Sequence, residues 1–205
     1  MIWQAPRDAP AALVLAHGAG AGMRHRHMQA HADAFERRGI ATLRFDFPFI
    51  EQGRSRVDSP EVATASIAEA VAAARERADL PIWLGGHSFG GRMASHAVAA
   101  GLVDPLGLIF CSFPLHNPGK PATSRASHLG AIAKPMLFLS GTRDPLADAE
   151  LLREVVAGLP SAELHWLDTA DHGYRVLKRS RASSEDVFDE IARVARDFIA
   201  RRSPR

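Results

Sequence analysis

Six short apolar runs are the feature of this 205-residue chain that most limits its possible folds. Apolar and polar residues do not alternate within them, and most runs are flanked by Gly, Pro or Asp. Strands that are covered on both faces have this pattern, and such strands form mainly parallel sheets. The sequence therefore predicts strands over residues 11–16, 40–45, 81–85, 106–111, 135–140 and 163–167.

The segments between these runs predict helices. Apolar residues recur at helical spacing over residues 59–77, where Ser59 suits the N-cap and Pro60 the first turn. We expect one α/β domain over residues 1–205, a three-layer α/β/α sandwich in which helices cover both faces of a mainly parallel sheet of six or seven strands. Further helices are predicted over residues 89–100, 148–158 and 184–201, the last with Ser184 as N-cap, and more weakly over 27–38.

Composition narrows the class of protein. Hydrophobic residues make up 46% of the chain and charged residues 23%, which is typical of soluble globular proteins. The single cysteine, Cys111, excludes an intramolecular disulfide. No apolar stretch suits a membrane span or a secretory signal, so we expect a cytoplasmic protein with no membrane partner. Basic residues are dispersed among acidic ones, and the net charge is only +2, so no nucleic-acid partner is predicted.

The segment Leu84–Arg92 contains the pattern Gly-x-Ser-x-Gly, with Ser88 at its centre. It follows a predicted strand and opens a predicted helix, which is the setting of a nucleophile elbow. Residues two positions before and after the serine must there be small, and Gly86 and Gly90 satisfy this. The segment predicts Ser88 as a nucleophile and the Phe89 N–H as an oxyanion donor, the alternative being an ordinary glycine-rich turn.

A serine nucleophile needs a histidine base and an orienting acid, which follow it in the chain order Ser, Asp, His. Asp144 and His172 each come just past the carboxyl end of a predicted strand, and these ends share one edge of a parallel sheet. We therefore expect Ser88, Asp144 and His172 to meet there. Asp168 remains a rival acid, whereas Asp171 is disfavoured because it adjoins the base in sequence.

A second glycine-rich loop, residues 17–23, directly follows the first strand. In a serine hydrolase with a nucleophile elbow, the loop after this strand donates the second N–H group to the oxyanion. We expect that N–H group to belong to Gly18, Ala19 or Gly20. A dinucleotide-binding loop with Asp46 as ribose acid is the alternative. It fails because the required third glycine is absent at positions 23 and 25.

His25, His27 and His31 are close enough in sequence to share a helix face as metal ligands. Neither a cysteine nor a Glu-x-x-His pattern accompanies them. We therefore predict that they are surface or loop histidines, and that the protein uses no metal and no other cofactor.

With these motifs the sequence resembles the α/β-hydrolase superfamily, and more narrowly a small lidless bacterial family akin to dienelactone hydrolases and to a testis-expressed animal protein. The narrower resemblance implies Ser88, Asp144 and His172 as the triad. Serine stands where dienelactone hydrolases carry cysteine, so their substrate does not carry over. The resemblance rests on His17–Gly20, Arg44–Pro48, the elbow through Ala94, Phe113–His116, Pro118–Pro121, Arg125, His128–Leu129, Gly141–Asp144 and Asp171–His172.

Many relatives insert a helical cap between the fourth and fifth predicted strands, but residues 112–134 are too short a segment for one. We therefore expect a minimal fold without a cap domain and a shallow, exposed site. Such a site admits bulky or polymeric esters and excludes water less well. Its expected lining is Phe47, Phe49, His87, Phe113, Leu115 and His116, and the alternative for the aromatic residues is that they belong to the core.

The sequence thus predicts a carboxylic ester hydrolase that works through an acyl-enzyme on small-molecule or polymeric esters. Two alternatives remain open. One is an acyltransferase or perhydrolase with the same triad, and the other is a non-catalytic binding module on the same fold.

Overall fold

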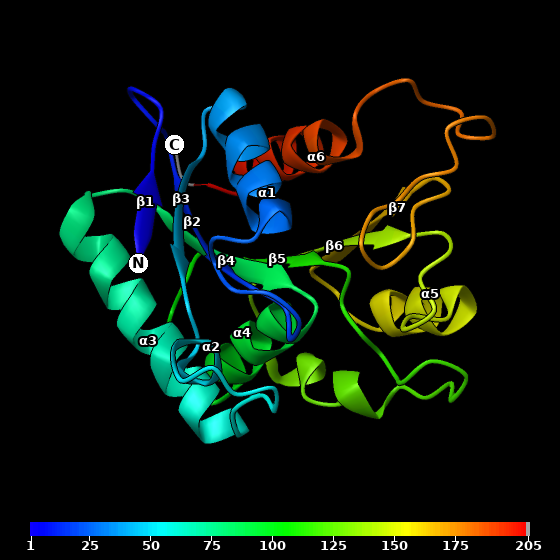
Figure 1. The fold of residues 1–205 in the computed structure, drawn as a ribbon, viewed down its shortest axis with the longest axis horizontal. Coiled ribbons are helices and arrows are strands. Elements are labelled where there is room, and N and C mark those ends of the chain that lie inside the picture. The colour runs from blue at the N-terminus through cyan, green and yellow to red at the C-terminus, as the bar shows by residue number, and fades with distance from the viewer. Residues whose placement is uncertain (204–205) are drawn as a thin grey trace.

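A seven-stranded sheet forms the centre of the computed structural model, which describes residues 1–203 (Figure 1). The strands lie in the order β1-β3-β2-β4-β5-β6-β7, and all neighbours are parallel except β1, which is antiparallel to β3. Their bounds are β1 (Ile2–Gln4), β2 (Ala12–Ala16), β3 (Ala41–Phe45), β4 (Ile82–His87), β5 (Leu108–Cys111), β6 (Met136–Gly141) and β7 (Ala162–Leu167).

The six predicted strands are confirmed, with ends that differ by at most two residues. The seventh strand, β1, has only three residues, and all of them are partly exposed at the sheet edge. The inner strands β2 to β6 are almost wholly buried. β1 therefore lacks the continuous apolar pattern by which those strands were predicted.

Helices cover both faces of the sheet (Figure 1). α1 and α6 pack together on one face, and α3, α4 and α5 contribute to the core on the other. The predicted three-layer α/β/α architecture is thereby confirmed. The helices are α1 (Arg26–Arg37), α2 (Pro48–Glu51), α3 (Pro60–Arg77), α4 (Phe89–Ala99), α5 (Ala149–Ala157) and α6 (Val187–Arg202), with two 3₁₀ turns, η1 (Ser124–Ala126) and η2 (Leu129–Ala131).

Side-chain caps define where several helices begin. Ser59 caps α3 as predicted, since its hydroxyl accepts from the Val62 N–H. The predicted cap of α6 is wrong: Asp186, not Ser184, accepts from the backbone N–H groups of the first turn. The negative charge of the Asp186 carboxylate also stabilises the helix, because it lies at the positive end of the helix dipole.

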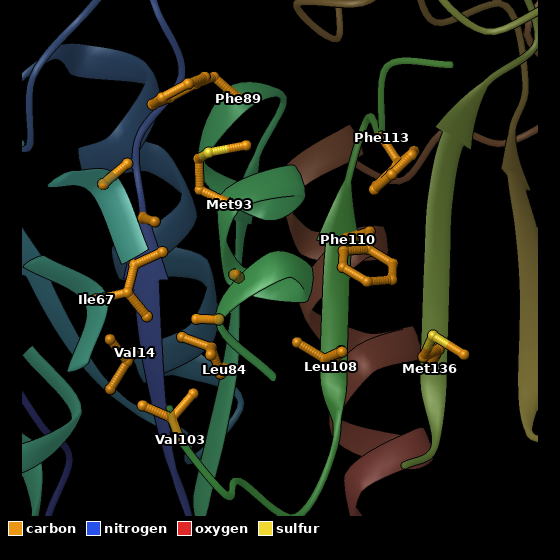
Figure 2. Close-up of a cluster of buried hydrophobic side chains, with 14 of the residues drawn as sticks. Val14, Ile67, Leu84, Phe89, Met93, Val103, Leu108, Phe110, Phe113 and Met136 are labelled. Atoms are coloured by element: carbon orange, nitrogen blue, oxygen red, sulfur yellow. The ribbon is translucent and has the colours of Figure 1, made fainter. Parts of the chain in front are cut away.

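The two faces of the sheet carry separate apolar cores. The core beneath α3 and α4 contains Met93, Phe110 and Phe113, and Figure 2 shows Met93 on the helix and Phe110 on the strand beside it. The opposite core joins α1 and α6 to the other face of the same strands through residues such as Phe35 and Phe198. Fully burying one such side chain contributes about 1.5–3 kcal/mol, so both helical layers are held firmly.

The segment between β5 and β6 contains no helix longer than the three-residue turns η1 and η2. It runs beside α4 rather than forming a separate layer (Figure 1). The fold therefore has no cap domain over the described residues, as the short length of this segment predicts. Among residues 1–203, no helix combines the length and apolarity that crossing a bilayer requires.

Candidate active site

Ser88 lies on the sharp turn between β4 and α4. Its backbone adopts φ 52° and ψ −116°, a conformation that non-glycine residues rarely enter. The Ser88 N–H donates to the Cys111 carbonyl at 2.9 Å, which ties the turn to the end of β5. A strained serine that is held in this way at a strand–helix turn is the geometry of a nucleophile elbow.

Close backbone contacts explain the glycines around Ser88. A Cβ atom on Gly86 would lie 2.3 Å from the Ala16 carbonyl oxygen, and one on Gly90 would lie 2.5 Å from the carbonyl oxygens of Ala16 and His17. Backbone atoms cannot retreat from such contacts without moving β2. The two glycines therefore let the elbow press directly against the neighbouring strand.

Ser88, His172 and Asp144 form a continuous chain of hydrogen bonds. His172 Nδ1 lies 2.8 Å from Asp144 Oδ2, and His172 Nε2 lies 2.8 Å from Ser88 Oγ. The carboxylate can only accept, so Nδ1 carries the proton and Nε2 accepts from the serine hydroxyl. The other oxygen of Asp144 accepts from the Leu146 N–H at 2.8 Å, and its side chain is fully buried. Both carboxylate oxygens are thus fixed in place.

The competing acids have other partners. Asp168 accepts from the Ala182 N–H at 2.9 Å, and Asp171 accepts from the backbone N–H groups of Gly173 and Arg175, also at 2.9 Å. These bonds shape the loops after β7. Among the three candidate acids, only Asp144 is within hydrogen-bond distance of the His172 ring.

The glycine-rich loop is anchored by the buried ring of His17. The Phe47 N–H donates to His17 Nε2 at 3.1 Å, so the ring proton is on Nδ1, which donates to the Gly18 carbonyl at 2.7 Å. Burial lowers the pKa of His17, which favours this neutral form. Asp46 holds the end of the same loop, because its carboxylate accepts a hydrogen bond from the Met23 N–H at 2.6 Å.

A cleft of about 810 Å³ opens beside Ser88 and His172. The glycine-rich loop and the start of α1 line one side, and the loop after β7 and the start of α6 line the other. The sequence analysis did not predict the larger apolar and aromatic side chains that line this cleft, which are His27, Met28, Tyr174 and Phe188. The first turn of a helix that follows a strand at this edge is the signal that points to His27 and Met28.

The predicted lining of the site is largely wrong. Apart from His87, none of the expected residues lines the cleft. Phe47, Phe49, Phe113 and Leu115 are buried in the core on the α3 and α4 face, where Figure 2 shows Phe113 packed near Phe110. His116 is buried as well: its Nδ1 bonds the Asn117 carbonyl, and its Nε2 accepts from the Asp148 N–H.

His87 lies between Ser88 and the loop that carries His172. Its Nε2–H donates to the His172 carbonyl oxygen at 2.9 Å, and a Cβ atom on Gly18 would lie 2.9 Å from its Nδ1. Burial, followed by His27 and His172, lowers the pKa of His87 to about 3, so the ring is neutral at pH 7. It therefore adds no charge beside His172.

The prediction that His31 is a surface or loop histidine is also wrong. The ring is fully buried on α1, and both its nitrogens lack hydrogen-bond partners within the described chain. It packs among His27, Tyr174 and Phe188 behind the cleft. No group of three or more potential metal-ligating side chains gathers in residues 1–203 in a way that could hold a metal ion.

The parallel sheet, the strained serine elbow and the hydrogen-bonded serine, histidine and aspartate together define the fold and site of an α/β hydrolase. Residues 9–200 match the model of the alpha/beta hydrolase domain family, and the chain belongs to this family.

Solved structures of low sequence identity share the fold. A dienelactone hydrolase from Anabaena variabilis is 18% identical with a TM-score of 0.77, over 98% of this chain and 91% of that one. The esterase Est1E from Butyrivibrio proteoclasticus with bound ferulic acid is 17% identical with a TM-score of 0.75, over 98% and 94%. A serine hydrolase without a lid from Xanthomonas campestris is 20% identical with a TM-score of 0.69, over 99% and 88%. These structures share the overall fold of this chain.

Proposed function

We propose that the protein is a serine esterase that hydrolyses carboxylic esters, with Ser88 as nucleophile, His172 as general base and Asp144 as the orienting acid. One observation carries this proposal: the Ser88 hydroxyl, the His172 ring and the Asp144 carboxylate are joined by two hydrogen bonds of 2.8 Å. This geometry lets a proton leave the hydroxyl for Nε2 while the carboxylate holds the ring in the required tautomer.

In the first half of the reaction, Ser88 Oγ attacks the ester carbonyl carbon. Its proton passes to His172 Nε2, and the carbonyl oxygen takes the electron pair of the broken π bond. The tetrahedral intermediate then expels the alcohol, which receives that proton from His172. In the second half, His172 deprotonates a water molecule that attacks the acyl-enzyme, and the acid is released with Ser88 restored.

Two backbone N–H groups are suited to stabilise the oxyanion. The Phe89 N–H is the first in α4, where helical N–H groups have no carbonyl partner. The second candidate is the Ala19 N–H. Because the C=O and N–H of a trans peptide point in opposite directions, and the Gly18 carbonyl points at His17, the Ala19 N–H points away from that buried ring. Losing one such donor typically costs about 2.7–4 kcal/mol of transition-state stabilisation.

The size and lining of the cleft support acceptance of bulky esters. Its walls carry Met28, Tyr174 and Phe188, which suit an apolar acyl or alcohol group. The segment over residues 112–134 adds no cap to close around a substrate. We therefore expect aromatic and polymeric esters to be accepted alongside small ones.

A fluorophosphonate probe tests the nucleophile. Wild type and Ser66→Ala, which removes an exposed hydroxyl on α3, should be labelled equally, and Ser88→Ala should not be labelled. A set of p-nitrophenyl and aryl esters graded by acyl and alcohol size then tests the substrate class. Equal labelling of Ser88→Ala and wild type would reject the assignment of the nucleophile.

A further inference from the structure

A group of basic side chains lies away from the cleft, between α4 and the 3₁₀ turns η1 and η2. Arg92 and His96 are four residues apart on α4 and therefore share one face of that helix. Arg125 belongs to η1, and His128 precedes η2, which contacts α4. We call these four residues the basic cluster. None of them lines the cleft beside Ser88, and the proposed ester hydrolysis does not use them.

Direct contacts hold the two histidines of the basic cluster in place. The rings of His96 and His128 stack with their centroids 3.7 Å apart and an interplanar angle of 16°. Ser95 Oγ donates to the Arg92 carbonyl at 2.7 Å and lies 2.7 Å from His128 Nε2, which must therefore be the donor to Ser95. Nε2 of neutral His128 therefore carries the ring proton, and Nδ1 does not. The imidazoles are thus fixed in place rather than loose on the surface.

The two arginines are positioned differently. Arg125 donates through both terminal nitrogens, to the His116 carbonyl at 3.0 Å and to the Asn117 side-chain oxygen at 2.6 Å. Arg92 Nε is buried and has no hydrogen-bond partner within the described chain. A buried guanidinium N–H without an acceptor is costly, and an oxygen atom of water or of a ligand would satisfy it.

The positive charge of the basic cluster has no compensating acid. Neither Arg92 nor Arg125 takes part in an ion pair among residues 1–203, although many arginines elsewhere in the chain do. Burial lowers the pKa of Arg92, and Arg125 lowers it further. Burial, followed by His96 and Arg92, lowers the pKa of His128 to about 4. Every charged neighbour that shifts these pKa values is itself basic.

From this arrangement we propose that the basic cluster is a binding site for a phosphate group, held mainly by Arg92 and Arg125. Two guanidinium groups match the charge of a phosphate dianion, and their planar donors suit its oxygens. Phosphate oxygens would supply the acceptor that Arg92 Nε lacks. The group can belong to free phosphate, to a small phosphate ester or to a lipid headgroup, all of which present the same oxygens.

Thermal unfolding with inorganic phosphate at constant ionic strength tests the site, because a ligand that binds only the folded state raises the unfolding temperature. Sulfate serves as a second dianion and chloride as the reference anion. We expect millimolar phosphate to stabilise wild type above chloride, and Arg92→Gln to weaken binding by about tenfold or more. Arg26→Gln, which removes an arginine of the cleft, is the matched control and should bind phosphate like wild type.

A second measurement needs no variant. The ring resonances of His128, followed by NMR against pH, should report a higher pKa when phosphate is present, since even the phosphate monoanion found at the pH of this titration stabilises a nearby imidazolium. Glycerol phosphate and phosphatidic acid vesicles then identify the source of the phosphate group.

Three results would each overturn the site: no phosphate-specific stabilisation of wild type, equal weakening in Arg92→Gln and Arg26→Gln, or an unchanged pKa of His128. Hydrolysis of esters by the same preparation is measured separately, so loss of one proposal leaves the other standing.

Discussion

Replacing Asp144 by Asn tests the proposed triad more severely than removing the nucleophile, because the change keeps the size of the side chain. Asp144 Oδ1 accepts from the Leu146 N–H and Oδ2 accepts from His172 Nδ1, both at 2.8 Å. An Asn side chain has one acceptor and one donor in these two places. If its oxygen keeps the Leu146 N–H, its NH₂ group faces the ring and forces the proton from Nδ1 to Nε2. That tautomer cannot accept the proton of Ser88.

The size of the effect follows from that geometry. A triad with the wrong histidine tautomer typically loses about 10⁴-fold in kcat, and at about 1.36 kcal/mol per factor of ten this is about 5.4 kcal/mol of barrier. The oxyanion donors and the cleft remain, so KM should change little. We expect Asp144→Asn to fold normally and to hydrolyse p-nitrophenyl acetate about 10⁴-fold more slowly than wild type.

Steady-state kinetics and circular dichroism on the purified variant provide the assay. Asp168→Asn is the matched control, because that carboxylate binds only the loop after β7 and should leave kcat within a fewfold of wild type. Near wild-type turnover in Asp144→Asn, with folding intact, would refute the role of Asp144 as the orienting acid.

Three further predictions concern the elbow and the buried histidines. Gly90→Ala should lower soluble yield or activity sharply, because its Cβ would lie 2.5 Å from the Ala16 and His17 carbonyl oxygens, and normal kinetics would contradict this. His31→Leu should raise the free energy of unfolding in urea by about 1–3 kcal/mol, since it removes buried polar atoms without partners, and a loss of stability would oppose it. Between pH 6.5 and about 4 the unfolded state binds protons that neutral His27 does not, so stability should fall as the solution is acidified, by up to about 1.4 kcal/mol per pH unit for each such histidine. Urea unfolding across this range should show a flat profile if those rings are not neutral in the folded state.

Local patterns predicted the strands well because inner parallel strands are buried on both faces. The sequence also predicted that Ser88, Asp144 and His172 lie together, because the carboxyl ends of β4, β6 and β7 share one edge of the sheet. Short elements without their own apolar periodicity were missed, as with β1 and α2, which have three and four residues.

The cleft lining could not be predicted, because the position of a residue after a strand does not tell which face of the sheet receives its side chain. Phe47, Phe49 and Phe113 turn to the face of α3 and α4, whereas the cleft opens on the side of α1 and α6. Met28 and Phe188 reach the cleft from helices about 160 residues apart in sequence, a contact that no local pattern contains.

The glycines at the elbow have one consequence for altering this protein. The Ser88 hydroxyl is positioned by main-chain contacts with β2 and β5, while the larger apolar and aromatic side chains of the cleft come from α1, α6 and the loop after β7. The position of the hydroxyl and the apolar lining of the cleft therefore depend on separate parts of the molecule. Substituting Met28 or Phe188 should therefore change which esters the cleft accepts, while the position of the Ser88 hydroxyl stays the same.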